Sequence, residues 1–371
     1  MNHDQDVELK TVTTFNEFLE LRHDWNSLLE QSGNDRVFLT HEWFASWWQA
    51  FGEGKRLFII AAVDRDGIQG IAPLMRCQSS FRGIPVRGVE FLSNDDSPGC
   101  GFILKKNHEY LAGTFFSFLL NDSKEWDVIF FKNMIHDETI NSLMVKVLEQ
   151  TGKRYIVNPG LSSPYIEIKS EWDEYIKGLS SKYRKTIRNV CNRIKRLGDV
   201  DVGEYNDMKG FDDIVSVTEK GWKYREGKAF INCPDRNRFF RLLSEEARNK
   251  GWLSIWCVYK GKEPIAYEYH LKYKGCDIAL LSEFNSEYKN FSPGSFLDHE
   301  IIRSLFVNGV HEYDMCGIHD EYKKKWTNNV RAYKNLIVFN NSVYSRFLHF
   351  LEDKPVRFFK RIRDKVTVTG T

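Results

Sequence analysis

An internal repeat constrains the fold of this chain more than any other feature of its sequence. A glycine turn followed by an Ile-Ala pair occurs twice, 194 residues apart, and a Ser-Pro-Gly tripeptide occurs twice, 195 residues apart. The paired motifs are Gly67 with Ile71-Ala72, Gly261 with Ile265-Ala266, Ser97-Pro98-Gly99, and Ser292-Pro293-Gly294. Because Pro-Gly is common in turns, the tripeptide alone does not indicate a repeat. The nearly equal offsets and the shared order of elements do. The chain is therefore expected to contain two copies of one unit.

Hydrophobic periodicity predicts similar elements in both halves. In the first half, Thr14 and Glu17 form a capping box before a helical pattern. The remaining predicted elements are a helix after Thr40, a hairpin of 57–63 and 68–77, a strand at 86–92, a helix at 109–120, a strand at 126–131, a helix at 138–150, and closing strands at 154–157 and 165–168. The second half predicts helices at 172–197, 211–224 and 234–250, a hairpin of 253–259 and 264–273, a strand at 276–284, a helix at 295–308 and a strand at 312–315.

This order predicts a mixed α/β (α+β) fold, in which each unit has a sheet of antiparallel and parallel strands flanked by helices. The expected division is an N-terminal unit at 1–165, a C-terminal unit at 166–340, and a basic, aromatic helical tail at 341–371.

Composition narrows the class of protein. Lys and Arg number 53 against 51 Asp and Glu, so no net positive field indicates DNA as the partner. The longest apolar run, Leu57–Val63, is too short for a membrane helix, and the first residues lack the pattern of a secretory signal. Seven cysteines without a Cys-x-x-Cys pair favour reduced thiols. We expect a soluble, cytoplasmic protein.

Several short motifs in the second half resemble a known family. They are Leu179-Ser180-Ser181-Lys182-Tyr183-Arg184-Lys185, Pro264-Ile265-Ala266, Phe284-Asn285-Ser286-Glu287-Tyr288 with Ser292-Pro293-Gly294, and Tyr313-Asp314 with Gly317, Tyr322-Lys323 and Trp326. In this order they resemble GNAT-superfamily acyltransferases of the CelD-like branch, named for cellulose biosynthesis and related to Fem-type aminoacyltransferases. The resemblance is strongest over 165–330 and weaker over 35–105. It departs from the family pattern at Asn285, where relatives tend to carry Asp.

The resemblance implies tandem GNAT-like units that transfer an acyl group from acyl-coenzyme A, such as acetyl-CoA, to an amine, with no metal. In such folds the co-substrate lies where two parallel strands separate, here 276–284 and 312–315, and its pyrophosphate lies at a helix N-terminus. The implied binding residues are Ser282, Ser292, Gly294, Ser295 and Phe296. The alternative for Ser-Pro-Gly-Ser is a turn followed by a helix cap.

Acylation of an amine needs a general base and a general acid. Glu268 and His270 alternate on one strand, so they share a face beside Ala266 and form either a catalytic pair or a solvated edge. Glu283, at the end of its strand, is a further candidate base or amine-binding carboxylate.

Asp314 lies within an apolar strand, where a carboxylate is either a structural anchor or a functional group with a shifted pKa. Tyr322 and Lys323 are candidates for the general acid and an adjacent cation. The alternative for 322–326 is an exposed basic loop that ends in a packing tryptophan.

A helix at 181–197 carries seven cations and no acid, and predicts an anionic ligand or a solvated charged face. Arg184 and Arg188, with Trp326, are the candidate substrate-binding residues. The basic, aromatic stretch 347–365 predicts either a packed terminal helix or a peripheral membrane contact.

The sequence lacks the motifs that are typical of metal sites, of phosphate-binding loops and of serine hydrolases. His311, His319 and Asp320 do not have metal-ligand spacing, and no phosphate-binding glycine loop or nucleophile elbow occurs. Three functions remain: an acyl-CoA-dependent N-acyltransferase acting on a small molecule or a saccharide amine such as an amino sugar or polysaccharide precursor, a Fem-type transferase that uses aminoacyl-tRNA on a cell-wall precursor, and a non-catalytic subunit of a polysaccharide-synthesis complex.

Overall fold

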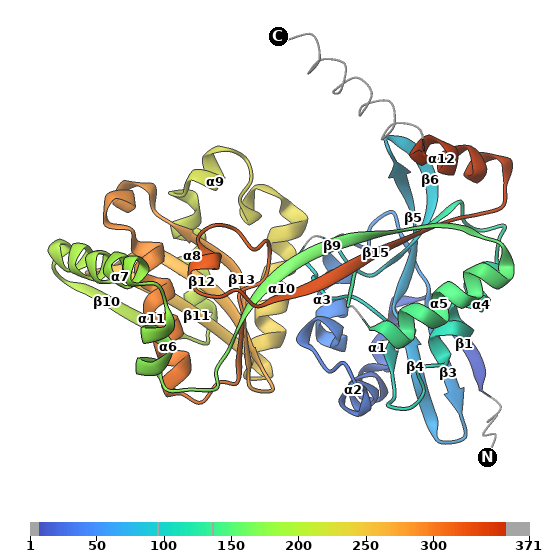
Figure 1. The fold of residues 1–371 in the computed structure, drawn as a ribbon, viewed down its shortest axis with the longest axis horizontal. Helices are drawn as coiled ribbons and strands as arrows, with labels where there is room; N and C mark the ends of the chain where they lie inside the picture. Colours follow the sequence, from blue (N-terminus) through green and yellow to red (C-terminus); the bar gives the residue numbers. More distant parts are fainter. Residues whose placement is uncertain (1–6, 95, 136, 354–371) are drawn as a thin grey trace, which may run out of the picture. The chain divides into compact units, whose positions relative to one another are not determined.

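A computed structural model describes residues 7–94, 96–135 and 137–353 of the chain (Figure 1). The chain divides into two compact units. Unit 1 holds the described residues within Met1–His41, Gly54–Gly160 and Tyr333–Thr371, and unit 2 consists of Glu42–Glu53 and Leu161–Ala332. In these described ranges, no helix has the length and apolar character that crossing a lipid bilayer requires.

Unit 1 contains two antiparallel-rich sheets and a group of short helices. Its elements are β1 (Glu8–Val12), α1 (Phe15–Glu20), α2 (Arg22–Gln31), η1 (Val37–Leu39), β2 (Arg56–Leu57), β3 (Ile59–Asp64), β4 (Gly67–Ala72), β5 (Leu74–Phe81), β6 (Ile84–Phe91), β7 (Ile103–Leu104), α4 (Leu111–Asn121), β8 (Val128–Ile135), α5 (Glu138–Thr151), the first half of β9 (Arg154–Glu167), most of β15 (Val330–Phe339) and α12 (Val343–Asp353). The strand orders are β1-β3-β4-β7 and β15-β8-β6-β5-β2. The predicted capping box of Thr14 and Glu17 is present.

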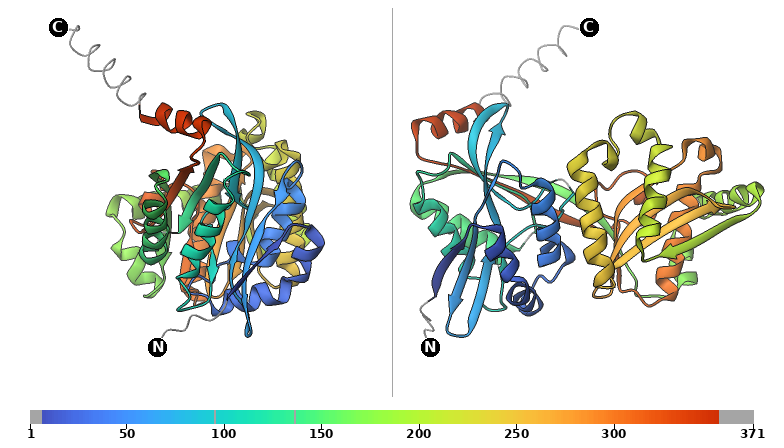
Figure 2. Two further views of the ribbon diagram at one scale, coloured as in Figure 1. Left: turned by 90° about the vertical axis from the view of Figure 1, so that its right-hand side faces the viewer. Right: turned by 180° about the vertical axis from the view of Figure 1, so that it is seen from behind.

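Unit 2 is built on one sheet with the strand order β10-β11-β12-β13-β14-β9. Helix α3 (His41–Phe51) belongs to unit 2 from its second residue on, since His41 is assigned to unit 1. The other elements of unit 2 are α6 (Trp172–Gly178), α7 (Ser181–Ile194), η2 (Lys195–Leu197), β10 (Val200–Tyr205), α8 (Met208–Glu219), α9 (Trp222–Arg225), η3 (Phe230–Asn232), α10 (Pro234–Asn249), β11 (Leu253–Lys260), β12 (Glu263–Tyr273), β13 (Cys276–Phe284), η4 (Ser286–Phe291), α11 (Pro293–Val307), β14 (Glu312–Asp314) and η5 (Lys323–Lys325). Figure 2 shows these elements from two further sides.

Helices cover both faces of the unit 2 sheet. On β12, the Tyr267 hydroxyl contacts Thr218 of α8 at 3.0 Å, and the Tyr269 hydroxyl contacts Ser244 of α10 at 3.1 Å. Because side chains alternate along a strand, the intervening Glu268 and His270 point to the opposite face, which α11 covers. The core on that side includes Ile301 of α11, which is fully buried.

The predicted mixed fold is confirmed. In each unit a meander of antiparallel strands is followed by a helix and then a parallel strand: β6, α4 and β8 in unit 1, and β13, α11 and β14 in unit 2. The repeated Ser-Pro-Gly motifs lie at the same point of this order but differ locally. Ser292-Pro293 begins α11, whereas Gly99 lies in a loop with a φ of 83°.

The division of the chain differs from the expected boundaries at 165/166 and 340/341. The aromatic helix α3 belongs mainly to unit 2, where Trp43 packs against Phe239 with ring centroids 5.2 Å apart. Strand β15 pairs with β8 through residues 333–339 and therefore belongs mainly to unit 1. Of the predicted tail, α12 covers 343–353, and residues 354–371 lie outside the described part of the chain.

Candidate active site

The parallel pair β13–β14 opens after three residues. Its register runs from Cys276 opposite Glu312 to Ile278 opposite Asp314, where β14 ends while β13 continues to Phe284. Cys316 and Gly317 have φ values of 46° and 61°, which turn the chain away from β13. The strand edge from residue 279 to 282, which includes Ser282, is partly or fully exposed. This geometry places an open strand edge at the predicted co-substrate position.

The N-terminus of α11 lies in the connection that follows this open strand. Ser292 adopts a left-handed conformation with a φ of 54°, and Pro293 occupies the first turn, where a missing N–H is tolerated. A Cβ added to Gly294 would meet only Phe284, at 3.7 Å, so the approach to this helix end is open. Ser295 is exposed and Phe296 is half-buried in the same turn.

Arg193 joins the basic helix α7 to this turn. Its Nη1 donates to Ser292 Oγ at 3.1 Å and to the Asn290 carbonyl at 3.3 Å. Two features that the sequence suggested separately, the basic helix and the Ser-Pro-Gly turn, therefore meet. A helix N-terminus with an adjacent guanidinium is suited to a phosphate group.

A buried polar network lies beneath the open strands. His270 is completely buried between two carboxylates: its Nε2 donates to Glu268 Oε2 at 3.0 Å, and its Nδ1 donates to Asp277 Oδ1. The Tyr313 hydroxyl of β14 also donates to Glu268, at 3.2 Å. Glu268 and His270 thus share a face as predicted, but their burial excludes a solvated edge.

Burial and neighbouring charges shift the pKa values of His270 and Asp298 in this network. Burial alone would lower the pKa of His270, but the carboxylates of Asp277 and Glu268 outweigh burial and raise this pKa to about 10. Burial, reinforced by Glu268, raises the pKa of Asp298 of α11 well above its usual value. The network therefore holds His270 as a cation and favours a proton on Asp298 at neutral pH.

Glu283 lies at a separate cavity of about 370 Å³ in unit 2. The cavity is lined by Trp222, Lys223, Lys228, Ala229, Phe230, Arg236, Tyr267, Leu280, Leu281, Ser282 and Glu283. Glu283 Oε1 accepts from the Phe284 N–H at 3.0 Å, and its buried Oε2 has no hydrogen-bond partner among the described residues. Lys223 Nζ is 3.9 Å from Oε2 and also donates to the Ser282 carbonyl at 2.8 Å. A buried carboxylate oxygen beside a cavity is suited to accept a proton from an amine.

Asp314 has the contacts of a structural anchor. One of its oxygens accepts from the Ser163 hydroxyl and from the Cys316 N–H, both at 3.0 Å, and the other accepts from Arg331 Nη1 at 2.7 Å. Arg331 also bonds both oxygens of Glu312 at 2.9 Å. Of the two interpretations of Asp314, this geometry favours the anchor.

Tyr322 and Lys323 lie near the end of β14. Lys323 Nζ donates to the carbonyls of Met315 and Cys316, at 2.9 and 2.6 Å, and so stabilises the turn that opens the strands. Tyr322 is 39% exposed, and burial of the rest of the side chain, together with the charges of Asp298 and Glu268, raises its pKa well above the usual value. Its hydroxyl therefore keeps its proton, as a general acid must.

The three predicted substrate-binding residues have different environments. Trp326 is 2% exposed and packs edge-on against Tyr183 at 5.1 Å, in agreement with the packing alternative. Arg184 Nη1 donates to the carbonyls of Lys177 and Leu179, both at 2.6 Å, and so caps α6. Arg188 is exposed on α7.

One cluster in the described ranges could hold a metal ion. The ligand atoms of Cys191, His299 and Glu300 lie within 4.8 Å of one another. Burial lowers the pKa of His299, but hydrogen bonds with Cys191 and Glu300 raise it to about 9. The sequence gives no signal for this cluster because its residues come from α7 and α11.

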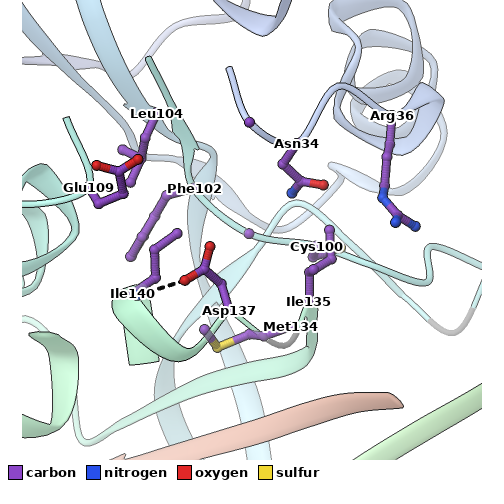
Figure 3. A pocket seen from close by; sticks show the side chains of 12 residues that line it. Asn34, Arg36, Cys100, Phe102, Leu104, Glu109, Met134, Ile135, Asp137 and Ile140 are labelled. Atoms are coloured by element: carbon purple, nitrogen blue, oxygen red, sulfur yellow. Dashed lines mark hydrogen bonds between the residues drawn. The ribbon is translucent and has the colours of Figure 1, made fainter. Parts of the chain in front are cut away.

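Unit 1 has its own cavity of about 220 Å³, bordered by Asn34, Arg36, Glu109 and Asp137 (Figure 3). Asp137 is the N-cap of α5, and its carboxylate accepts a hydrogen bond from the Ile140 N–H at 3.0 Å. The remaining lining is largely apolar, from residues such as Phe102 and Ile140.

One family model matches a segment of unit 2. Residues 181–324 match the family described as an acetyltransferase (GNAT) domain. A comparison with curated protein sequences finds no match. The family match supports a GNAT acetyltransferase domain within this segment of the chain.

Solved structures share the fold across most of the chain. FemX is 14% identical, with a TM-score of 0.58, over 92% of this chain and 100% of that one. L-PGS from Bacillus licheniformis is 11% identical, with a TM-score of 0.53, over 89% and 95%. A conserved protein of unknown function from Bacteroides thetaiotaomicron is 10% identical, with a TM-score of 0.57, over 90% and 99%.

Proposed function

We propose that unit 2 is an N-acyltransferase that moves an acyl group from acyl-coenzyme A to an amine. The single observation that carries this proposal is the open end of the parallel pair β13–β14, followed along the chain by the N-terminus of α11. The edge of β13 beyond Ile278 offers backbone groups to the amides of pantetheine, and α11 offers N–H groups to pyrophosphate. The resemblance to CelD-like proteins adds an amino sugar or a polysaccharide precursor as the proposed acceptor.

Glu283 is the proposed general base. Its Oε2, which has no hydrogen-bond partner among the described residues and lies 3.9 Å from Lys223 Nζ, takes the proton that the acceptor ammonium must lose before attack. The amine nitrogen then forms a bond to the thioester carbon, and the C–S bond breaks. Tyr322, which follows the end of β14 and keeps its hydroxyl proton, is the proposed donor of a proton to the departing thiolate.

The buried network is proposed to position these groups rather than to react. Glu268 and His270 are 5% and 0% exposed, so a substrate cannot reach them without unfolding the core. They tie β12 to β13 through Asp277 and to β14 through Tyr313. In this account Asp314 and Lys323 fix the turn at the end of β14 and have no chemical role.

Titration calorimetry with acetyl-CoA and longer acyl-CoAs tests the proposal. We expect one site per chain with micromolar affinity, as is usual for such substrates, and formation of free thiol once an amine acceptor is added. Absence of binding by every acyl-CoA would contradict the proposal.

Arg193→Gln is expected to weaken acyl-CoA binding about tenfold, which corresponds to ~1.4 kcal/mol, because it removes a charged donor beside the proposed phosphate position. Arg196→Gln, an exposed position in η2, is the matched control and should change affinity less than about twofold. Equal affinities of the two variants would place the phosphates elsewhere.

Aminoacyl-tRNA is the second candidate donor, because α7 presents exposed cations at Lys182, Lys185 and Arg188. Salt-sensitive binding of tRNA, with no binding of acyl-CoA, would favour this candidate. A non-catalytic role would be favoured if neither donor binds.

A further inference from the structure

The contact between α7 and α11 in unit 2 brings together three side chains with sulfur, nitrogen and oxygen donors. Cys191 comes from α7, and His299 and Glu300 come from α11. Cys191 Sγ lies 3.7 Å from His299 Nδ1, and His299 Nδ1 lies 2.9 Å from Glu300 Oε1. The three ligand atoms are all within 4.8 Å of one another. The proposed acyl transfer uses none of these residues.

Both partners of His299 face the same ring nitrogen. Nδ1 carries at most one hydrogen, so it donates to either Cys191 or Glu300 but not to both. In a relay that activates a thiol, the thiol and the carboxylate contact different ring nitrogens. The arrangement is therefore not that of a catalytic triad, and the three donors gather around one shared position.

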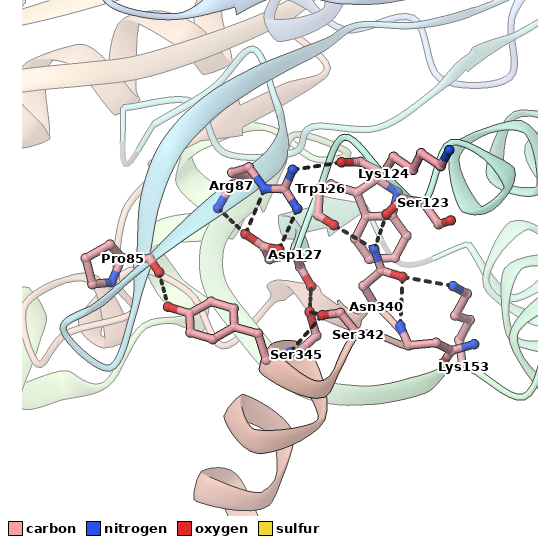
Figure 4. A network of polar contacts seen from close by, with 12 residues as sticks. Pro85, Arg87, Ser123, Lys124, Trp126, Asp127, Lys153, Asn340, Ser342 and Ser345 are labelled. Carbon is pink, nitrogen blue, oxygen red and sulfur yellow. Dashed lines mark hydrogen bonds and ion pairs between the residues drawn. The ribbon is translucent and has the colours of Figure 1, made fainter.

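A polar network in unit 1 shows the contrasting arrangement, in which each group has partners of its own (Figure 4). Arg87 donates through Nε and Nη2 to the two oxygens of Asp127, at 3.1 and 2.8 Å. Lys153 donates to Asn340 Oδ1 at 3.2 Å. These groups satisfy one another directly, whereas the single Nδ1 of His299 is shared by two groups. An ion that replaces the proton on Nδ1 bonds all three donors at once.

The spacing of the donors fits tetrahedral zinc. Bonds of about 2.3 Å to sulfur and about 2.0–2.2 Å to nitrogen and oxygen place neighbouring ligand atoms about 3.4–3.6 Å apart. The Cys191–His299 distance of 3.7 Å is close to this spacing. The His299–Glu300 distance of 2.9 Å is that of a hydrogen bond, and a shift of about half an ångström in the flexible Glu300 side chain widens it to the ligand spacing.

The cluster is accessible and yet held in place. The His299 and Glu300 side chains are 14% and 28% exposed, so an ion can enter from solvent. Trp172 packs edge-on against the His299 ring, with centroids 5.5 Å apart, and this contact restrains the ring. Helix α7 is itself anchored to the start of α11, because Arg193 donates to Ser292 Oγ. The ligands therefore need little rearrangement to bind an ion.

The donor types and their charges select zinc. A thiolate and an imidazole favour Zn²⁺ over Mg²⁺ and Ca²⁺, which take oxygen ligands. The thiolate of Cys191 and the carboxylate of Glu300 balance the two charges of the ion. Lys195 and Arg303, whose charges act on Glu300, therefore face a neutral centre and not an unbalanced dication.

We propose that Cys191, His299 and Glu300 bind one Zn²⁺ ion, with a water molecule as the fourth ligand. The thiol proton, and the proton on His299 Nδ1, pass to solvent as the metal–ligand bonds form. The ion fixes α7 against α11 and so holds in place the basic helix that carries Arg193. Zinc binding is independent of the proposed acyl transfer, because no atom of the cluster takes part in that reaction.

Zinc titration of the untagged, full-length protein, after removal of metals by chelation, tests this site. We expect one Zn²⁺ per chain, measured by competition with a zinc-binding dye. Cys191→Ser and His299→Gln should each weaken zinc binding at least about tenfold, because each removes one of the three protein ligands. The matched control is Cys233→Ser, at an exposed cysteine of unit 2, and this variant should bind zinc like the parent.

Cobalt absorption and thermal unfolding identify the ligands by separate readouts. Co²⁺ in place of zinc should give a thiolate-to-cobalt charge-transfer band that Cys191→Ser loses and Cys233→Ser keeps. Zinc should raise the unfolding midpoint of the parent but not of Cys191→Ser, and the metal-free variants should keep the parent's circular dichroism.

The proposal is wrong if the parent binds no zinc, or if Cys191→Ser and His299→Gln both bind it as tightly as the parent. Should either variant misfold, Glu300→Gln decides, because it changes the side chain least. Weaker zinc binding by Glu300→Gln supports the site, and unchanged binding overturns it.

Discussion

Asp277→Asn is expected to lower the free energy of unfolding by about 3 kcal/mol, because it leaves the buried imidazolium of His270 with one carboxylate instead of two. Asp277 is completely buried, so water cannot replace the lost charge. Urea denaturation followed by circular dichroism measures the effect. Asp201→Asn, on the exposed side of β10, is the matched control and should change stability by less than about 0.5 kcal/mol.

The same variant should change how stability depends on pH. In the folded protein the pKa of His270 is raised to about 10, so the folded state holds a proton that the unfolded chain loses near pH 6.5. The stabilising contribution is thus fully present below pH 6.5 and is lost as the pH rises to about 10. Asp277→Asn should flatten this decline. A variant with the parent's pH dependence and a loss below about 1 kcal/mol would show that His270 is not held as a cation.

Glu283→Gln is expected to lower kcat/KM about 10²- to 10³-fold, because the amide cannot accept the ammonium proton. Affinity for acyl-CoA should stay within about twofold, because acyl-CoA is proposed to contact backbone groups of β13 and α11 and not the Glu283 carboxylate. Steady-state kinetics across pH with the preferred amine checks both expectations.

The matched control for Glu283 is Glu287→Gln, an exposed carboxylate in the neighbouring η4. It should retain nearly full activity. If Glu283→Gln keeps activity within about threefold of the parent, another group removes the proton and the cavity lined by Lys223 has a different role.

Local sequence patterns predicted most of the elements of unit 2 that surround the proposed site. The period-two pattern placed Glu268 and His270 on one strand face, and a short apolar run predicted β14. The predicted helix 172–197 is instead two helices, because Ser180 caps α7. β10 has only half-buried apolar positions, which leaves a weak alternating signal.

Long-range pairing explains what the sequence could not predict. Asp277 and Asp298 join His270 and Glu268 only through sheet register and the crossover helix, and neither has a local motif. Pro73 interrupts the predicted strand 68–77, so β4 and β5 enter different sheets. Trp326 resembled a binding residue in sequence, but the surrounding aromatic packing makes it part of the core.

Hydrogen–deuterium exchange with and without acetyl-CoA tests the central claim most directly. The account predicts slower exchange at the amides of residues 279–283 on β13 and of residues 294–297 in the first turns of α11, and little change in unit 1. Protection confined to other segments, or no protection at saturating acetyl-CoA, would contradict an acyl-CoA site between the separated strands.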